Sequence, residues 1–138
     1  MISTIERVVF LRTVDLFRHI PGEVLARVAE IAQEVRFGPN DEIVREGASG
    51  DAMFLLIEGY VDVVKGDRLV VTLGPKECVG EMALLDSEPR SATVRCKDAV
   101  HALQILREDF YDLMSGHVEI ARGVIKILIQ RLRKTTGS

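Results

Sequence analysis

The chain has 138 residues, of which 47% are hydrophobic, so it can build one ordinary hydrophobic core but not a second large one. The formal net charge of -3 provides none of the broad positive surface that nucleic-acid-binding proteins use, so direct binding of DNA or RNA is not expected. We therefore expect a single domain over residues 1–138.

No part of the sequence predicts association with a membrane. The longest uninterrupted apolar run covers residues 52–57, whereas a membrane-spanning helix needs roughly 20 apolar residues. The N-terminus carries the acidic Glu6 and does not have the pattern of a secretory signal, which favours a cytoplasmic protein. Cys78 and Cys96 are too few for a disulfide framework or a metal cluster, and buried free thiols are the simplest interpretation.

Two short helices are predicted within residues 1–34. Apolar residues recur at helical spacing over residues 3–17 and again over 21–33. Pro21 suits a first helical turn, where its missing N–H is not needed, and Glu23 adds a favourable negative charge there.

The pattern changes between Val35 and Leu106, where short apolar runs are separated by turn residues. The spacing predicts about eight short strands. Two of them are expected to be hinged at Gly59, and a tight hairpin with a positive φ at Gly66 should follow. Because short strands with regular turns are typical of closed double sheets, we predict a β-barrel over residues 35–107.

Helical spacing returns over residues 108–114 and 117–134, so we predict C-terminal helices over 108–134. The last helix has apolar residues around more than half of its circumference, although one packed face needs an arc only a little over about 100° wide. Two partners are therefore expected, and the sequence leaves open whether the second is core packing, a domain contact, a ligand or a second copy. Its apolar residues are Val118, Ile120, Ala121, Val124, Ile125, Ile127, Leu128, Ile129 and Leu132.

The segment GEMALLDSEPRSATV, residues 80–94, places two opposite charges around small residues. Gly80 lets the backbone turn, and the five residues after it have the composition of a short helical turn, whose first amides attract anions. Arg90 offers a planar fork of donors for two phosphate oxygens at the start of the next strand. Glu81 is suited to neutral donors such as sugar hydroxyls. The segment therefore predicts a sugar-phosphate site, and three small residues would let the ligand approach the backbone: Ala83, Ser91 and Ala92.

Gly80-Glu81-x-Ala83-Leu84-Leu85, followed by Pro89-Arg90-Ser91-Ala92-Thr93-Val94, resembles the phosphate-binding cassette of the cyclic nucleotide-binding domain family. Similar stretches precede it, namely LFRHIPGEVL and GASGDAMFLLIEGYVDVV. The resemblance implies an eight-stranded β jelly-roll, or double-stranded β-helix, with N-terminal helices and a C-terminal helix. It also implies a regulatory or sensor domain without catalytic activity, in which ligand binding moves the C-terminal helix.

The resemblance assigns a task to individual residues. Arg90 would bind the exocyclic oxygens of a cyclic phosphate, together with the amides of Ala83 and Ser91, and Glu81 would accept a hydrogen bond from the ribose 2′-hydroxyl. Ser91 lies between the Thr that favours cyclic GMP in this family and the Ala usual for cyclic AMP, with a lean towards cyclic AMP. The predicted ligand-binding set is Gly80, Glu81, Met82, Ala83, Arg90, Ser91 and Ala92. The implied ligand is cyclic AMP or cyclic GMP, and the implied partners are a homodimer mate at the C-terminal helix and an effector domain outside this chain.

Two departures from the family pattern stand out. Lys76 and Glu77 occupy the places of a common Gly-Asp pair, and Val79 replaces a common Phe. The first change could alter the turn before the cassette, and the second removes apolar contact, so they bear on affinity more than on the site itself.

Other functions fit the sequence less well. His19, His101 and His117 lack the paired spacing of a metal-binding jelly-roll enzyme, and no nucleophile lies beside Glu81 and Asp86, so we expect no metal, no cofactor and no catalysis. The alternative without ligand binding is that Arg90 and Glu81 form a buried structural ion pair. The leading alternative function is a degenerate domain of the same fold that acts as a protein-interaction or dimerisation module.

Overall fold

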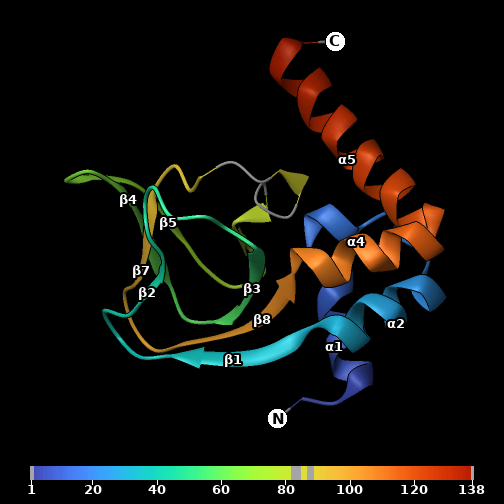
Figure 1. The fold of residues 1–138 in the computed structure, drawn as a ribbon, viewed down its shortest axis with the longest axis horizontal. Helices are drawn as coiled ribbons and strands as arrows, with labels where there is room; N and C mark the ends of the chain where they lie inside the picture. Colours follow the sequence, from blue (N-terminus) through green and yellow to red (C-terminus); the bar gives the residue numbers. More distant parts are fainter. Residues whose placement is uncertain (1, 82–84, 87–88, 138) are drawn as a thin grey trace. The chain divides into compact units, whose positions relative to one another are not determined.

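A computed structural model describes residues 2–81, 85–86 and 89–137 of the chain. The chain divides into two compact units, one formed by residues 1–31 with 110–138 and the other by residues 32–109. The second unit contains the strands, and the first is built from helices (Figure 1).

Two antiparallel four-stranded sheets form the strand unit within the described residues. The first sheet has the order β1-β8-β3-β6, with β1 Gln33–Phe37, β8 Val100–Leu106, β3 Ala52–Glu58 and β6 Cys78–Val79. The second has the order β2-β7-β4-β5, with β2 Glu42–Val44, β7 Thr93–Cys96, β4 Val61–Lys65 and β5 Arg68–Leu73. The eight strands confirm the number that the turn spacing predicts, and their bounds lie close to the expected 35–107.

A core lies between the sheets because both contribute apolar side chains to one cluster. Phe54 and Leu56 enter it from β3, and Val61 and Val94 enter it from the second sheet. Phe37 packs on the cluster and meets Phe54 edge to face, with ring centroids 5.8 Å apart. Each strand is thereby fixed in register, since a slip by one residue would turn these side chains outwards.

The predicted turns are confirmed. Gly59 separates β3 from β4 with a φ of 93°. A two-residue turn joins β4 to β5, where Lys65 pairs with Arg68 and Gly66 has a φ of 62°. These glycines adopt backbone angles that other residues reach only with strain.

The helical unit contains α1 Thr4–Arg12, the short 3-10 helix η1 Asp15–Phe17, α2 Gly22–Ile31, most of α4 Arg107–Gly116, and α5 Val118–Thr136. The expectation of one helix over residues 3–17 was wrong. The side chain of Thr13 donates to the carbonyl of Phe10 at 2.6 Å, and Val14 is extended, so these two residues separate α1 from η1. At the other end, α5 is one continuous helix as predicted.

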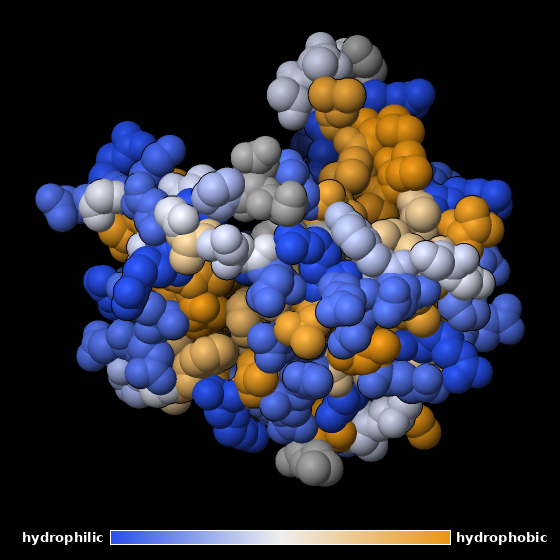
Figure 2. Space-filling view, in the orientation of Figure 1, coloured by the Kyte–Doolittle hydropathy of each residue, from blue (hydrophilic) through white to orange (hydrophobic). Residues whose placement is uncertain are grey.

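Helix α5 has a buried face and an exposed apolar face. Ile120, Val124 and Ile127 are buried, and α5 packs on η1, where Arg131 pairs with Asp15 at 3.1 Å. Figure 2 shows the second face as a hydrophobic stripe along α5. Its most exposed apolar residues are Val118, Ile125, Ile129 and Leu132. The prediction that α5 has more apolar surface than one packed face needs is therefore confirmed, and within the described residues only one of the two faces is buried.

Over the described residues, none of the helices combines the length and the hydrophobicity that a membrane crossing demands.

Leu103 and Leu69 provide a matched test of this architecture. Leu103 lies on central strand β8 with 0% exposure, whereas Leu69 lies on edge strand β5 with 58% exposure. We expect Leu103→Ala to lower the free energy of unfolding by about 3 kcal/mol because it leaves a cavity, and Leu69→Ala to change it by less than about 0.5 kcal/mol. Urea denaturation measures both, and equal effects would contradict the arrangement of the sheets.

Candidate functional site

A cavity of about 450 Å³ opens in the strand unit beside residues 80 and 90. Residues of β2, β4, β5, β6 and β7 line it, together with the segments next to β6 and β7. Its size is within the usual range for a small-molecule site.

The structure brings five of the seven predicted ligand residues to this cavity. Gly80 and Glu81 lie at one side of its lining, after β6, and Arg90, Ser91 and Ala92 lie before β7. The other two, Met82 and Ala83, lie outside the described residues. Gly80 turns the chain with a φ of 78°, as its position at the end of a strand predicts. A carboxylate, a guanidinium and a hydroxyl are therefore gathered around one hollow.

Arg90 is held in place by its backbone. Its amide donates to the carbonyl of Ala48 at 2.8 Å, and its own carbonyl accepts from the amide of Gly47 at 2.8 Å. Pro89 forms an isolated bridge with Ser49. Residues 89 and 90 thus pair with residues 47–49, and two residues separate Arg90 from β7, whereas the sequence predicted Arg90 at the start of that strand. The difference arises because both backbone polar groups of Arg90 are already satisfied by this loop.

The side chain of Arg90 is half-buried and lies against two glycines. Its Nη2 donates to the carbonyl of Ala52 at 2.6 Å. A Cβ atom added at Gly50 or at Gly80 would overlap the guanidinium. Gly80 therefore leaves room for Arg90 as well as for any ligand, and Gly50 is a site residue that sequence reasoning missed. Its only signal in the sequence was its place in the GASGDAMFLL stretch of the family resemblance.

Two charged neighbours act on Arg90. Burial lowers the pKa of Arg90, the charge of Arg107 lowers it further, and the charge of Asp51 opposes both. An arginine pKa so far above neutrality leaves the side chain cationic in spite of this. Arg90 also lines a second cavity of about 290 Å³, together with Asp51, Ser49 and other residues. Arg90 is therefore a partly desolvated cation, and such a cation binds anions more strongly than one in bulk water.

Apart from Asp86, the rest of the described cavity lining is mainly apolar. Side chains of all four strands of the second sheet form a wall without charge: Val44, Val63, Val71, Leu73 and Val94. The wall suits a flat apolar group held beside the charged end. Sequence reasoning missed these residues, although their inward positions on alternating strands could have indicated them.

The two cysteines are free, as expected, but they differ in surroundings. Burial raises the pKa of Cys96 to about 11, so its thiol stays protonated at neutral pH. Cys78 is half-buried and lines the cavity. The prediction of a buried free thiol is therefore confirmed for Cys96, whereas the free thiol of Cys78 is only half-buried.

The turn before the cavity survives the replacement of the family's glycine. Lys76 adopts a φ of 74°, and its amide donates to the carbonyl of Leu56 at 2.8 Å. Glu77 accepts from the amide of Gly74 at 2.9 Å. A left-handed conformation costs a residue such as lysine roughly 1–2 kcal/mol, so this turn carries local strain at Lys76.

Chemically, the described lining of the cavity offers the guanidinium of Arg90, the carboxylates of Glu81 and Asp86, the hydroxyl of Ser91 and an apolar wall. Among the described residues, no three His, Cys, Asp or Glu side chains gather in a way that could hold a metal ion. The arrangement can bind a small molecule that carries an anionic group, hydroxyl groups and a flat apolar part.

Known proteins are similar to this chain in sequence and fold. A cGMP-dependent protein kinase of Drosophila melanogaster is 32% identical over 119 residues, which is 80% of this chain and 13% of the kinase. The N-terminal domain of a transcriptional regulator from Streptomyces coelicolor is 28% identical with a TM-score of 0.84, and 93% of each chain is covered. The regulatory domain of Toxoplasma gondii PKA, crystallised with cAMP, is 27% identical with a TM-score of 0.75, over 80% of this chain and 44% of that one.

These likenesses confirm the predicted jelly-roll fold with flanking helices. The chain spans only a small part of the length of the kinase, so the likeness concerns one module of it. The family model of the cyclic nucleotide-binding domain matches residues 34–117. This range includes all described residues that line the cavity, and it includes both sheets apart from Gln33, the first residue of β1. The chain belongs to the cyclic nucleotide-binding domain family.

Proposed function

We propose that the chain is a sensor domain that binds cyclic AMP or cyclic GMP and performs no catalysis. The observation that carries the proposal is the partly desolvated Arg90, which is held beside Glu81 and Ser91 in a cavity of nucleotide size. Family membership supports it, since related proteins include one named for cyclic GMP and one crystallised with cAMP.

In this proposal the charged end of the cavity takes the sugar phosphate. Arg90 binds two exocyclic phosphate oxygens, and the amides of Ala83 and Ser91 complete the cradle. Glu81 accepts a hydrogen bond from the ribose 2′-hydroxyl, and Gly80 gives the sugar room. Met82 and Ala92 complete the binding set. The geometry of the five described members is compatible with these tasks.

The purine base then lies on the apolar wall. Val63, Val71 and Leu73 contribute apolar surface but no hydrogen-bonding side-chain group that could tell adenine from guanine. Ser91 lines the same cavity with an exposed hydroxyl. We therefore assign base preference to this residue, with a lean towards cyclic AMP.

Ligand binding is proposed to act on the C-terminal helix. A ligand moves a helix only if it binds two helix positions with different affinity, so α5 should have a ligand-dependent position. The output would pass to an effector outside this chain, in the cytoplasm. In this proposal the domain binds the nucleotide and does not convert it, so it acts without catalysis.

A second copy of the chain is the proposed partner of the exposed face of α5. Val118, Ile125 and Leu132 are exposed and lie seven residues apart, with Leu128 between the last two. This is the heptad spacing by which two helices pack along a common seam. The same face supports the alternative function, a dimerisation module that binds no nucleotide.

Binding is tested by calorimetry with cyclic AMP and cyclic GMP. Arg90→Lys should weaken binding by about 1.5 to 3 kcal/mol, since lysine loses the paired, charge-assisted hydrogen bonds to phosphate. Arg68→Lys, on exposed β5, is the matched control and should leave affinity unchanged. If neither nucleotide binds at millimolar concentration, the sensor function is rejected in favour of the interaction module. Equal affinity of wild type and Arg90→Lys would place the phosphate elsewhere.

Base preference is tested at Ser91. Ser91→Thr should shift the ratio of the two dissociation constants towards cyclic GMP, whereas Ser91→Ala should shift it towards cyclic AMP. Competition between the two nucleotides measures this ratio directly. A ratio that is the same in all three proteins would show that another residue distinguishes the bases.

Dimerisation is tested by light scattering after size-exclusion chromatography. The wild type should be a dimer, and Ile125→Asp should be a monomer because a charge on the seam is desolvated when two helices pack. Val70→Asp, an equally drastic change at an exposed residue of β5, should remain a dimer. A monomeric wild type, or a dimeric Ile125→Asp, would argue against this partner.

A further inference from the structure

Three successive carbonyl groups beside the cavity accept hydrogen bonds from two arginines. The Nη1 of Arg107 donates to the carbonyl of Gly50 at 2.9 Å, and the amide of Arg107 donates to that of Asp51 at 2.7 Å. The next carbonyl, of Ala52, accepts from Arg90 at 2.6 Å. The segment from Gly50 to Ala52 is therefore fixed by Arg107 at one end and bound to Arg90 at the other.

Gly50 contacts the side chains of both arginines. The guanidinium of Arg90 lies so close to its Cα that an added Cβ would overlap Nε and Cζ. Any shift of Gly50 therefore moves the surface on which Arg90 rests. The side chain of Arg107 holds the carbonyl of this same residue, so it opposes such a shift.

The charges indicate a functional task more than a stabilising one. Two guanidinium groups on one short segment repel each other, and the charge of Arg107 lowers the pKa of Arg90. The charge of Asp51 raises this pKa by more than Arg107 lowers it, so burial is the main cost of keeping Arg90 charged. An anion bound to Arg90 would offset that cost of burial, so the arrangement is better suited to the occupied site than to the empty one.

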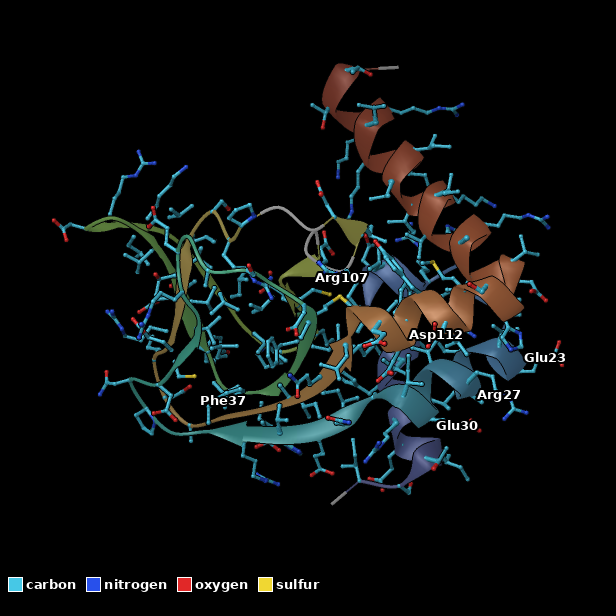
Figure 3. The ribbon with its side chains drawn as sticks, in the orientation of Figure 1. Glu23, Arg27, Glu30, Phe37, Arg107 and Asp112 are labelled. Atoms are coloured by element: carbon cyan, nitrogen blue, oxygen red, sulfur yellow. The ribbon has the colours of Figure 1, made fainter. Side chains whose placement is uncertain are left out.

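We infer that Arg107 is a positioning residue of the ligand site, which acts by holding Gly50 and thereby the guanidinium of Arg90. The link to ligand affinity rests on the proposed function, whereas the link to the order of Arg90 does not. Arg107 is the first residue of α4, at the point where β8 leads into that helix (Figure 3). A shift of residues 50–52 on ligand binding would therefore act directly on the start of α4.

The inference is tested first without ligand, by NMR of the arginine Nε–Hε groups. The Arg90 signal is assigned by its loss in Arg90→Lys. In Arg107→Met, which keeps the length of the side chain but removes its donors, this signal should move and its hydrogen should exchange with water at least about tenfold faster. Arg107→Lys should restore the wild-type signal, because lysine can still donate to the carbonyl of Gly50. The exposed Arg68→Met is the control and should change nothing at Arg90.

The second measurement is affinity for cyclic AMP by calorimetry. Arg107→Met should bind about fivefold to tenfold more weakly, and Arg107→Lys should bind nearly as well as wild type. Thermal unfolding of each variant separates this effect from a general loss of stability. An unchanged Arg90 signal in Arg107→Met overturns the inference, and so does unchanged affinity. If the wild type binds no cyclic nucleotide, the proposed function fails, and the Arg90 signal alone decides the positioning role.

Discussion

The site depends on keeping the side chain of Arg90 partly out of water. Burial of Arg90 costs free energy, as the lowered pKa shows, and the structure offsets this with the carbonyl of Ala52 and the nearby charge of Asp51. The loop of residues 47–49 satisfies its backbone. Because a guanidinium has five donors and the Ala52 carbonyl accepts one hydrogen bond, the side chain can still bind a phosphate group.

The strand unit gives this arginine a fixed frame. Both sheets contribute to the core between them, and the apolar wall of the cavity is built from the same strands. A site on such strands is expected to keep its shape when a ligand enters, so the proposed response would arise in the segments joined to it. Helix α4 follows directly on β8, and α5 follows α4, so the proposed path to α5 begins at α4.

The sequence predicted whatever is encoded locally. Turn residues predicted the strands and the turn at Gly59, and the residue types of 80–94 indicated the segment that lines the cavity around Arg90, whose role in binding phosphate stays a prediction. It did not predict contacts between distant segments: Gly50 lies 40 positions before Arg90 in the chain, and no periodicity indicates that they touch. Helix bounds failed where a side chain competes with the backbone, as at Thr13. The strain at Lys76 was also invisible, because only the folded turn reveals a positive φ.

The central claim is that Arg90 binds the phosphate of a cyclic nucleotide inside the described cavity. A crystal structure of the protein grown with cyclic AMP tests it most directly. The account predicts exocyclic phosphate oxygens within hydrogen-bonding distance of Arg90, the ribose 2′-hydroxyl hydrogen-bonded to Glu81, and the base against the apolar wall. A cavity that stays empty at saturating nucleotide, or a phosphate bound away from Arg90, would contradict it.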